Sequence, residues 1–179
     1  IAVFEDPYLG DVIRKTSYDQ FCDEHAFIFS ISSLSYLFKS RGMEIVDVKP
    51  QETHGGSMRV YLAHQGSRPV SQAVPHAVEQ EKKLELHCLE TYYNFRKRCE
   101  ESRDQLATLL RKLRREGKRV VGYAATSKST TVTNYCSITP DLVEFISATT
   151  PLKQGRFSPG VHIPVRSHEE FSAHPPDYA

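Results

Sequence analysis

A long helical pattern lying between two groups of short strand patterns constrains the fold of this chain more than any other feature. Residues from roughly 76 to 117 are predicted to be helical, with one apolar stripe formed by Phe95, Cys99, Leu106, Leu109, Leu110 and Leu113. Short apolar runs precede and follow this segment. The sequence therefore predicts a mixed α/β chain with two sets of strands and helices between them.

The first set of strands surrounds a short helix. Residues 1 to 4 are predicted to form a buried strand that gives way to a loop at Glu5. A helix is indicated by Phe27, Ile31, Leu34 and Phe38, which recur at helical spacing and are followed by a stop at Gly42. Ser17 and Gln20 resemble a capping box before a helical turn. Two further strands are predicted around 45–48 and 58–62.

The second set follows a linker that contains Gly66 and Pro75. Strands are predicted at 120–123 and 142–146, with a loop at 124–128 and a helix from 129 to 136 between them. This strand–helix–strand order is typical of the start of a Rossmann-like domain. Five prolines from Pro151 onward predict that the remainder is mostly loop.

The charge and the cysteines narrow the class of protein. A net charge of +1 favours neither nucleic acid nor an anionic membrane as a partner, and no apolar run approaches the roughly 18 residues of a membrane span. The four cysteines lack zinc-ligand spacing, so we expect no metal site in this chain. Their spread suits free thiols in a reducing compartment, and we expect a cytoplasmic protein.

An acid and a histidine adjoin where a polar stretch precedes the predicted helix. Glu24 and His25 are neighbours, and a histidine can remove a proton near neutral pH. On a helix their side chains would diverge by about 100°, so Glu24 is not assured as the partner that orients the ring. The alternative is a surface histidine after acids that favour a helix N-terminus.

A paired glycine forms the centre of a second polar stretch. Gly55 and Gly56 permit unusual backbone angles and close approach of a ligand. His54, Ser57 and Arg59 flank them, and a guanidinium can bind a phosphate through two hydrogen bonds. An ordinary hairpin loop with incidental polar residues explains the pattern equally well.

Two loops in the last third of the chain favour phosphate binding. The loop after Tyr123 uses small residues and leads into a helix N-terminus, where Lys128, Ser129 and Thr130 would lie. A basic loop with Lys153 and Arg156 follows the last predicted strand. Ala124 replaces the second glycine of a dinucleotide fingerprint, which argues against a nicotinamide-dependent enzyme. An ordinary βα turn and a solvated loop remain the alternatives.

Taken in order, these stretches resemble the sugar-nucleotide C-methyltransferase family over roughly residues 1 to 165. The resemblance rests on Glu5-Asp6-Pro7-Tyr8, Asp23-Glu24-His25, His54-Gly55-Gly56-Ser57-Met58-Arg59, Gly122-Tyr123, Lys128-Ser129-Thr130-Thr131, Asn134-Tyr135-Cys136, Pro151-Leu152-Lys153-Gln154-Gly155, Ser158-Pro159-Gly160 and His162-Ile163-Pro164. It implies a three-layer α/β architecture. Residues 1–66 would end a class I methyltransferase sheet, 67–117 would form a linker and helices, and 118–179 would form a truncated Rossmann-like domain.

The resemblance also implies an activity. Such enzymes use S-adenosylmethionine to methylate a carbon next to the keto group of a nucleotide-linked deoxysugar, typically a TDP sugar. His25 would be the base that forms the enolate, assisted by Glu24, and His54 is a candidate to support the enolate oxygen. Substrate contacts are expected from Cys22, His54, Ser57, Arg59, Lys128, Ser129, Thr130, Asn134, Lys153 and Arg156.

Two departures and one alternative accompany the resemblance. Cys22 stands where many relatives carry an aromatic hydroxyl, and Ala124 and Ser127 stand where relatives often have glycine and alanine. The donor-binding turn and a zinc-binding domain of such enzymes would precede Ile1, so we expect the isolated chain to be inactive. The alternative function is a noncatalytic sugar-nucleotide-binding module of the same fold.

Overall fold

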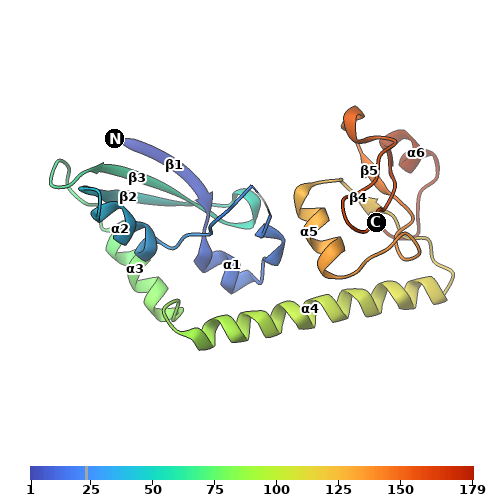
Figure 1. Ribbon diagram of the computed structural model, residues 1–179, viewed down its shortest axis with the longest axis horizontal. Helices are drawn as coiled ribbons and strands as arrows, with labels where there is room; N and C mark the ends of the chain where they lie inside the picture. The colour runs from blue at the N-terminus through green and yellow to red at the C-terminus, as the bar shows by residue number, and fades with distance from the viewer. Residues whose placement is uncertain (23) are drawn as a thin grey trace. The chain divides into compact units, whose positions relative to one another are not determined.

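The chain folds into two compact units. The computed structural model describes residues 1–22 and 24–179, and it divides into unit 1, residues 1–98, and unit 2, residues 99–179 (Figure 1). Each unit holds one three-stranded sheet, and the described residues form six α-helices. The predicted mixed α/β class is confirmed, whereas the functional boundaries after 66 and 117 stay a prediction.

The sheet of unit 1 is antiparallel. Its strands are β1 (Ala2–Pro7), β2 (Met43–Gln51) and β3 (Ser57–His64), in the order β1-β3-β2. All three predicted strands are present. The loop predicted from Glu5 is wrong, because Glu5 pairs with Arg59 and Pro7 with Ser57, so that β1 continues to Pro7.

Two α-helices and a 3₁₀ turn follow β1 in unit 1, and the second helix has a side-chain cap. After β1 come α1 (Leu9–Lys15), a 3₁₀ turn (Tyr18–Gln20) and α2 (Ile31–Lys39). Ser30 and Ser33 form a reciprocal capping box that starts α2 at Ile31. Phe27, predicted to lie on this helix, precedes it and is 71% exposed. α2 ends at Lys39, and Gly42 of the predicted stop follows in a turn with a φ of 69°. Ser17 makes no side-chain capping bond.

A buried carboxylate joins three elements of unit 1. Glu81 lies on α3 (Ala73–Lys83), is 2% exposed, and accepts hydrogen bonds from Tyr8 Oη at 3.0 Å and Ser32 N at 2.9 Å. The Ile31 amide and the Ser32 hydroxyl also donate to it. Burial and the Glu81 charge raise the pKa of the Tyr8 hydroxyl well above its usual value, so Tyr8 stays a donor. Glu81 thus connects the end of β1, the start of α2 and α3.

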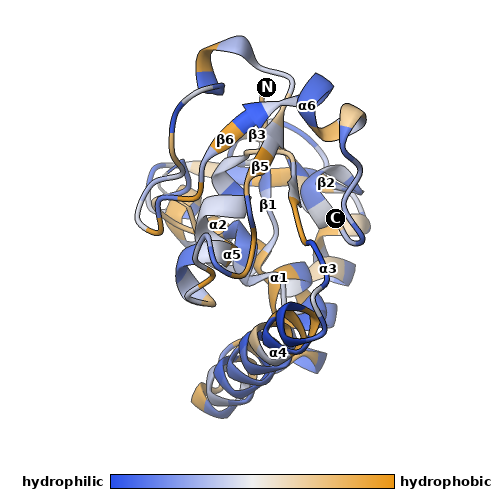
Figure 2. Ribbon diagram, turned by 90° about the vertical axis from the view of Figure 1, so that its right-hand side faces the viewer, coloured by the Kyte–Doolittle hydropathy of each residue, from blue (hydrophilic) through white to orange (hydrophobic). Residues whose placement is uncertain are grey.

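The long helical region consists of α3 and α4 (Leu89–Arg115), and the boundary between the units lies within α4. Pro75 falls in the first turn of α3, where a missing amide hydrogen is tolerated, and not in a linker. Figure 2 shows that α4 is largely hydrophilic, with a few apolar positions. Leu110 and Leu113 are buried as predicted, but Leu109 is 50% exposed, since each helical residue turns by about 100°. No helix among the described residues is long and apolar enough to cross a membrane.

The sheet of unit 2 is parallel, in the order β4-β5-β6. The elements of this unit are β4 (Gly122–Tyr123), α5 (Ser127–Tyr135), β5 (Ile146–Ala148), a 3₁₀ turn (Pro151–Lys153), β6 (Val165–Ser167) and α6 (His168–Ala173). The predicted strand–helix–strand unit is confirmed.

Two local predictions in unit 2 are wrong. Residues 142–145 form no strand, because the amides of Leu142 and Val143 bond back to Thr139 O in a turn, and β5 starts only at Ile146. The proline-rich remainder is not mostly loop either. It contributes β6, which pairs with β5, and the short helix α6.

Removing the Glu81 carboxylate should destabilise unit 1 strongly. We expect Glu81→Ala to lower the free energy of unfolding by at least about 3 kcal/mol, because it leaves several buried donors without an acceptor. Glu79→Ala is the matched control, since Glu79 is on the same helix but its side chain is 55% exposed. Chemical denaturation of both variants checks this. Equal losses for the two would contradict the role of Glu81.

An ion pair in unit 2 should make its stability depend on pH. The hydrogen bond from Arg119, 2.6 Å from Glu144, lowers the pKa of the Glu144 carboxyl below its ordinary value of 4.5. A lowered folded-state pKa stabilises the fold above pH 4.5, and this contribution is lost as the pH falls through the folded-state pKa. The stability advantage of the wild type over Glu144→Gln should therefore shrink below pH 4.5. Thermal unfolding across pH checks this, and a constant difference would contradict it.

Candidate functional site

His25 is paired with a carboxylate from β1. Its Nδ1 lies 3.1 Å from Asp6 Oδ1, and the two side chains are 29% and 27% exposed. The His25 amide also donates to Cys22 O, in the short loop that precedes α2. The imidazole is therefore held at the surface of unit 1 by a partner on a regular strand, with part of the ring accessible.

The alternation of β1 explains why Asp6 faces His25. Successive strand residues point to opposite faces, and the neighbouring Glu5 contacts Ser57 and Arg59. Burial raises the pKa of the Asp6 carboxyl, while the charge of His25 and its hydrogen bond oppose this shift. A carboxylate at Nδ1 fixes the ring and leaves Nε2 as the nitrogen that can accept a proton.

Cys22 and Glu24 lie close to the same imidazole. One ligand-type atom from each of Cys22, Glu24 and His25 is within 4.8 Å of the others, and Cys22 is a free, half-buried thiol. Three groups that can bind a metal thus converge in this loop. The predicted roles of Glu24 and Cys22 toward a substrate stay predictions, and Asp23, part of the acid-acid-histidine motif, lies outside the described residues.

The paired glycines lie in the turn between β2 and β3, at the same end of the sheet as the last residues of β1. Gly55 and Gly56 have φ values of 88° and 140°, so their predicted conformational freedom is used. A side chain at Gly56 would meet Asp11 Oδ2 at 2.1 Å, and the close approach is therefore made by this chain itself. His54 is exposed in this turn, and its carbonyl accepts from the buried Gln20 amide. Its predicted oxyanion role stays a prediction.

Ser57 and Arg59 are both bound to Glu5. Arg59 donates through Nη2 at 2.9 Å and through Nε at 3.2 Å, and the Ser57 hydroxyl donates at 2.8 Å. These hydrogen bonds, from Ser57 first and Arg59 second, lower the pKa of the Glu5 carboxyl. A phosphate would have to share Arg59 with Glu5, and the predicted substrate contacts of Ser57 and Arg59 stay predictions.

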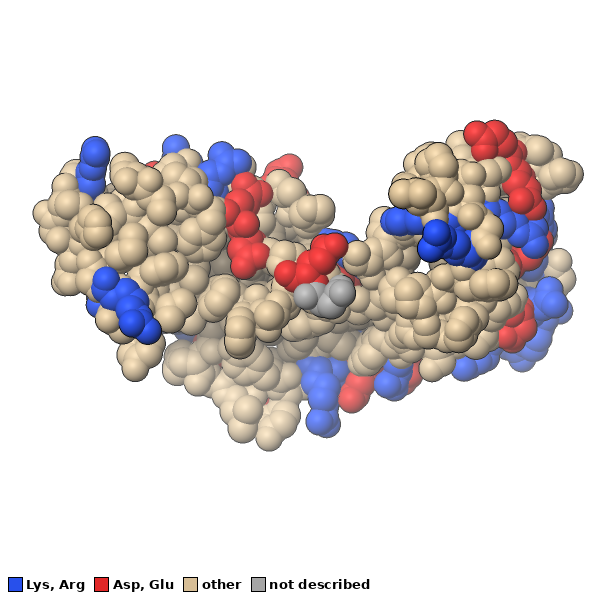
Figure 3. Space-filling view, turned by 45° about the horizontal axis from the view of Figure 1, so that its top comes forward, with Lys and Arg blue, Asp and Glu red and all other residues tan. Residues whose placement is uncertain are grey.

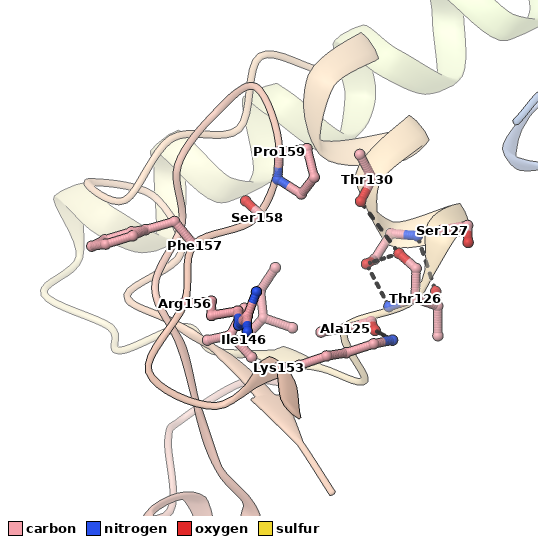
Figure 4. A pocket seen from close by; sticks show the side chains of 12 residues that line it. Ala125, Thr126, Ser127, Thr130, Ile146, Lys153, Arg156, Phe157, Ser158 and Pro159 are labelled. Atoms are coloured by element: carbon pink, nitrogen blue, oxygen red, sulfur yellow. Dashed lines mark hydrogen bonds between the residues drawn. The ribbon is translucent and has the colours of Figure 1, made fainter. Parts of the chain in front are cut away.

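Unit 2 contains a cavity of ≈ 230 Å³ between the start of α5 and the loop after β5 (Figure 4). Ser129, Thr130, Lys153 and Arg156, all predicted to bind substrate, line it. Figure 4 shows Lys153 extending toward the start of α5, where its Nζ donates to Ala125 O at 2.6 Å. The described lining residues include two cations and no Asp or Glu, which favours an anionic ligand.

The start of α5 is ordered by its own residues. Thr126 caps the helix, because its hydroxyl oxygen accepts a hydrogen bond from Ser129 N. In return the Ser129 hydroxyl oxygen accepts a hydrogen bond from Thr126 N. Ala124 has a φ of 73°, a left-handed conformation that glycine adopts more easily, and its amide donates to Ser147 O at 3.0 Å. The loop keeps its shape although alanine replaces the expected glycine.

Lys128 and Asn134 lie on α5 but are not among the residues that line this cavity. The Asn134 amide donates to Thr130 O and to Pro159 O at 2.9 Å, and so connects α5 with the loop around Pro159. A side chain at Gly160 would collide with Asn134 Oδ1. In this structure Asn134 fixes one wall of the site, and the predicted substrate contacts of both residues stay predictions.

Sequence reasoning missed Asp6 as the partner of His25. The motif Glu5-Asp6-Pro7-Tyr8 was recognised, but β1 was predicted to end before it, so no face of the strand was assigned to Asp6. A strand carried on to Pro7 would have placed Glu5 and Asp6 on opposite faces. Phe157 and Ser158, which also line the cavity of unit 2, were missed as well.

Comparison with known proteins places the chain in a family. A family model described as the C-methyltransferase C-terminal domain matches residues 52–179. The C-methyltransferase NovU of Streptomyces niveus is 36% identical over 175 residues, which make up 97% of this chain and 42% of NovU. The chain thus spans less than half the length of this curated relative. Because the family model covers well over half of the sequence, the chain belongs to the C-methyltransferases and carries their C-terminal domain.

Proposed function

We propose that this chain is the C-terminal portion of an S-adenosylmethionine-dependent enzyme that methylates carbon next to the keto group of a nucleotide-linked deoxysugar. The observation that carries the proposal is the His25–Asp6 pair, a partly exposed imidazole with a carboxylate 3.1 Å from its Nδ1. Its substrate class comes from the motif resemblance, and membership of the C-methyltransferases supports it.

His25 takes the proton that makes the sugar carbon nucleophilic. A C–H next to a ketone can ionise because its electron pair moves onto the carbonyl oxygen as an enolate. Nε2 of His25 accepts the proton, and the imidazolium that forms is stabilised by Asp6 at Nδ1. One polar atom of Glu24 and the sulfur of Cys22 lie within 4.8 Å of the ring nitrogen.

S-adenosylmethionine supplies an electrophilic methyl group when it is bound, and we assign it to the preceding part of the full-length protein. Two of the described glycines, Gly10 and Gly122, leave no room for it. A Cβ at Gly10 would meet the Tyr8 ring at 2.6 Å, and one at Gly122 would meet Ile146 at 3.0 Å. The space beside both glycines is filled by the chain's own side chains.

The cavity of unit 2 would hold the diphosphate of the nucleotide sugar. Lys153 and Arg156 supply positive charge, and Ser129 and Thr130 supply hydroxyl groups at the start of α5. The partial positive charge of a helix N-terminus adds to this. A volume of ≈ 230 Å³ suits a compact anion such as diphosphate, with the sugar and the base extending beyond it.

Sheet topology supports the proposed class I and Rossmann-like arrangement. In unit 1 the last strand in sequence, β3, lies between β1 and β2 and is antiparallel to both. A class I methyltransferase sheet closes with such an antiparallel strand. In unit 2 the parallel pair β4 and β5 is connected through α5, as in a Rossmann-like unit.

Replacing the base should abolish methyl transfer. In the full-length protein, His25→Asn should lower kcat by about 10² to 10⁴ fold, the usual contribution of a general base. Asp6→Asn should lower kcat by about 10 fold or more with little change in KM, because it weakens the orientation of the ring and the stabilisation of the imidazolium but not substrate binding. Methylation of a TDP-linked keto-deoxysugar with S-adenosylmethionine is the assay.

His64→Asn is the matched control, since His64 is exposed at the end of β3 and should leave kcat unchanged. Glu24→Gln separates the two acids near the ring. If Glu24→Gln lowers kcat while Asp6→Asn does not, Glu24 and not Asp6 orients the base. Methylation by His25→Asn near the wild-type rate would favour the noncatalytic binding module.

Removing one cation from the cavity should weaken binding of TDP. Arg156→Ala should raise the Kd of TDP by about 10 to 150 fold, because a hydrogen bond to a charged group contributes about 1.5–3 kcal/mol. Calorimetric titration of this chain with TDP and with inorganic diphosphate measures the effect. Lys112→Ala is the control, since Lys112 is an exposed cation on α4 beside Glu116. An unchanged Kd for Arg156→Ala would place the nucleotide elsewhere.

A further inference from the structure

We propose that Cys22, Glu24 and His25 form a binding site for Zn²⁺ or a similar thiolate-seeking divalent ion. These residues offer a sulfur, a carboxylate oxygen and an imidazole nitrogen, and the three atoms lie within 4.8 Å of one another. No spacing rule for zinc ligands identifies this site in the sequence, because the three residues converge only through the local turn before α2.

The geometry is close to that of a tetrahedral zinc site. Zinc–ligand bonds of about 2.0–2.3 Å place neighbouring ligand atoms roughly 3.3–3.8 Å apart. The three ligand atoms lie within 4.8 Å of one another, so an approach of at most about 1–1.5 Å brings each pair to this spacing. Cys22, Glu24 and His25 belong to a short loop between helical segments, so this adjustment leaves the sheet and α2 in place.

Asp6 supports the proposed metal site through its contact with Nδ1 of His25. A metal-bound histidine usually donates its other ring N–H to a carboxylate, which fixes the tautomer and raises the basicity of the ligating nitrogen. With Nδ1 of His25 3.1 Å from Asp6, the nitrogen left for a metal is Nε2. The pairing that serves a base therefore serves a metal ligand equally well.

The ligand set selects the kind of ion. A thiolate and an imidazole favour Zn²⁺ and related ions over Mg²⁺ or Ca²⁺, which prefer all-oxygen sites. Acidic side chains gather on one face of unit 1, and they add a field that attracts cations (Figure 3). On binding, the Cys22 thiol loses its proton to solvent and forms a sulfur–metal bond.

A bound metal would occupy the nitrogen that the proposed reaction uses. Coordination takes the lone pair of His25 Nε2, so the ring can no longer accept a proton from carbon. Zinc would therefore inhibit methyl transfer, a consequence that rests on the proposed function. Binding of the metal does not depend on that function and can be measured without it.

Titration of this chain with Co²⁺, a spectroscopic substitute for Zn²⁺, tests the site directly. We expect a thiolate-to-cobalt absorption band in the wild type that is displaced by Zn²⁺. The band should be absent from Cys22→Ser and strongly weakened in His25→Gln. Cys88→Ser is the matched control, because Cys88 is the other half-buried free thiol of the chain, and it should keep the full band. Circular dichroism of each variant verifies folding.

Two results would overturn the site. One is a wild-type chain without a thiolate band at saturating Co²⁺, and the other is a band that survives in Cys22→Ser. Inhibition of the full-length enzyme by Zn²⁺ provides the second readout. If Co²⁺ binds as expected but Zn²⁺ does not inhibit, the metal site stands and the base assignment of His25 fails.

Discussion

The hydrogen bonds to Glu81 hold unit 1 in the shape on which its candidate functional residues depend. The Glu81 carboxylate receives the Tyr8 hydroxyl from one side and the Ile31 and Ser32 amides from the other. Tyr8 and Ile31 are the two ends of the segment that contains Cys22, Glu24 and His25. Leu9 N also donates to Phe29 O at 2.9 Å, which brings these ends together a second time. The loop is therefore closed by fixed anchors, and Asp6 lies two residues before the first of them.

The repeating parts of the fold were predictable from the sequence because they depend on local periodicity. Apolar and polar residues alternate over 58–62 in β3, and Gly42, in the turn after α2, uses a left-handed φ of 69°. The run Leu142–Ile146 misled the prediction because buried turns and buried strands share apolar composition. Only its last residue belongs to β5, since the amides of Leu142 and Val143 are held in a turn by Thr139 O. β6 was missed because its three residues form a strand only through pairing with β5.

The residues of the candidate site also divide into those that could be predicted from the sequence and those that could not. Ser129, Thr130, Lys153 and Arg156 were predicted because two general rules place ligands at helix N-termini and at the carboxyl ends of parallel strands. Asp6 could not be assigned, because its partner lies 19 positions away in a loop without periodicity (Asp6 to His25). The convergence of Cys22 with Glu24 and His25 was equally hidden, since it depends on the turn that the chain takes and not on spacing alone.

The left-handed Ala124 has a consequence for ligands of unit 2. An alanine pays roughly 1 kcal/mol more than glycine in this conformation, so the surrounding bonds must impose it. Ser147 O accepts from Ala124 N, and Ala124 O accepts from Thr126 N, which fixes both sides of the peptide. The rim of the cavity is therefore preorganised: an incoming anion would meet a loop that has already lost its conformational entropy, and its affinity would not be reduced by the cost of ordering that loop.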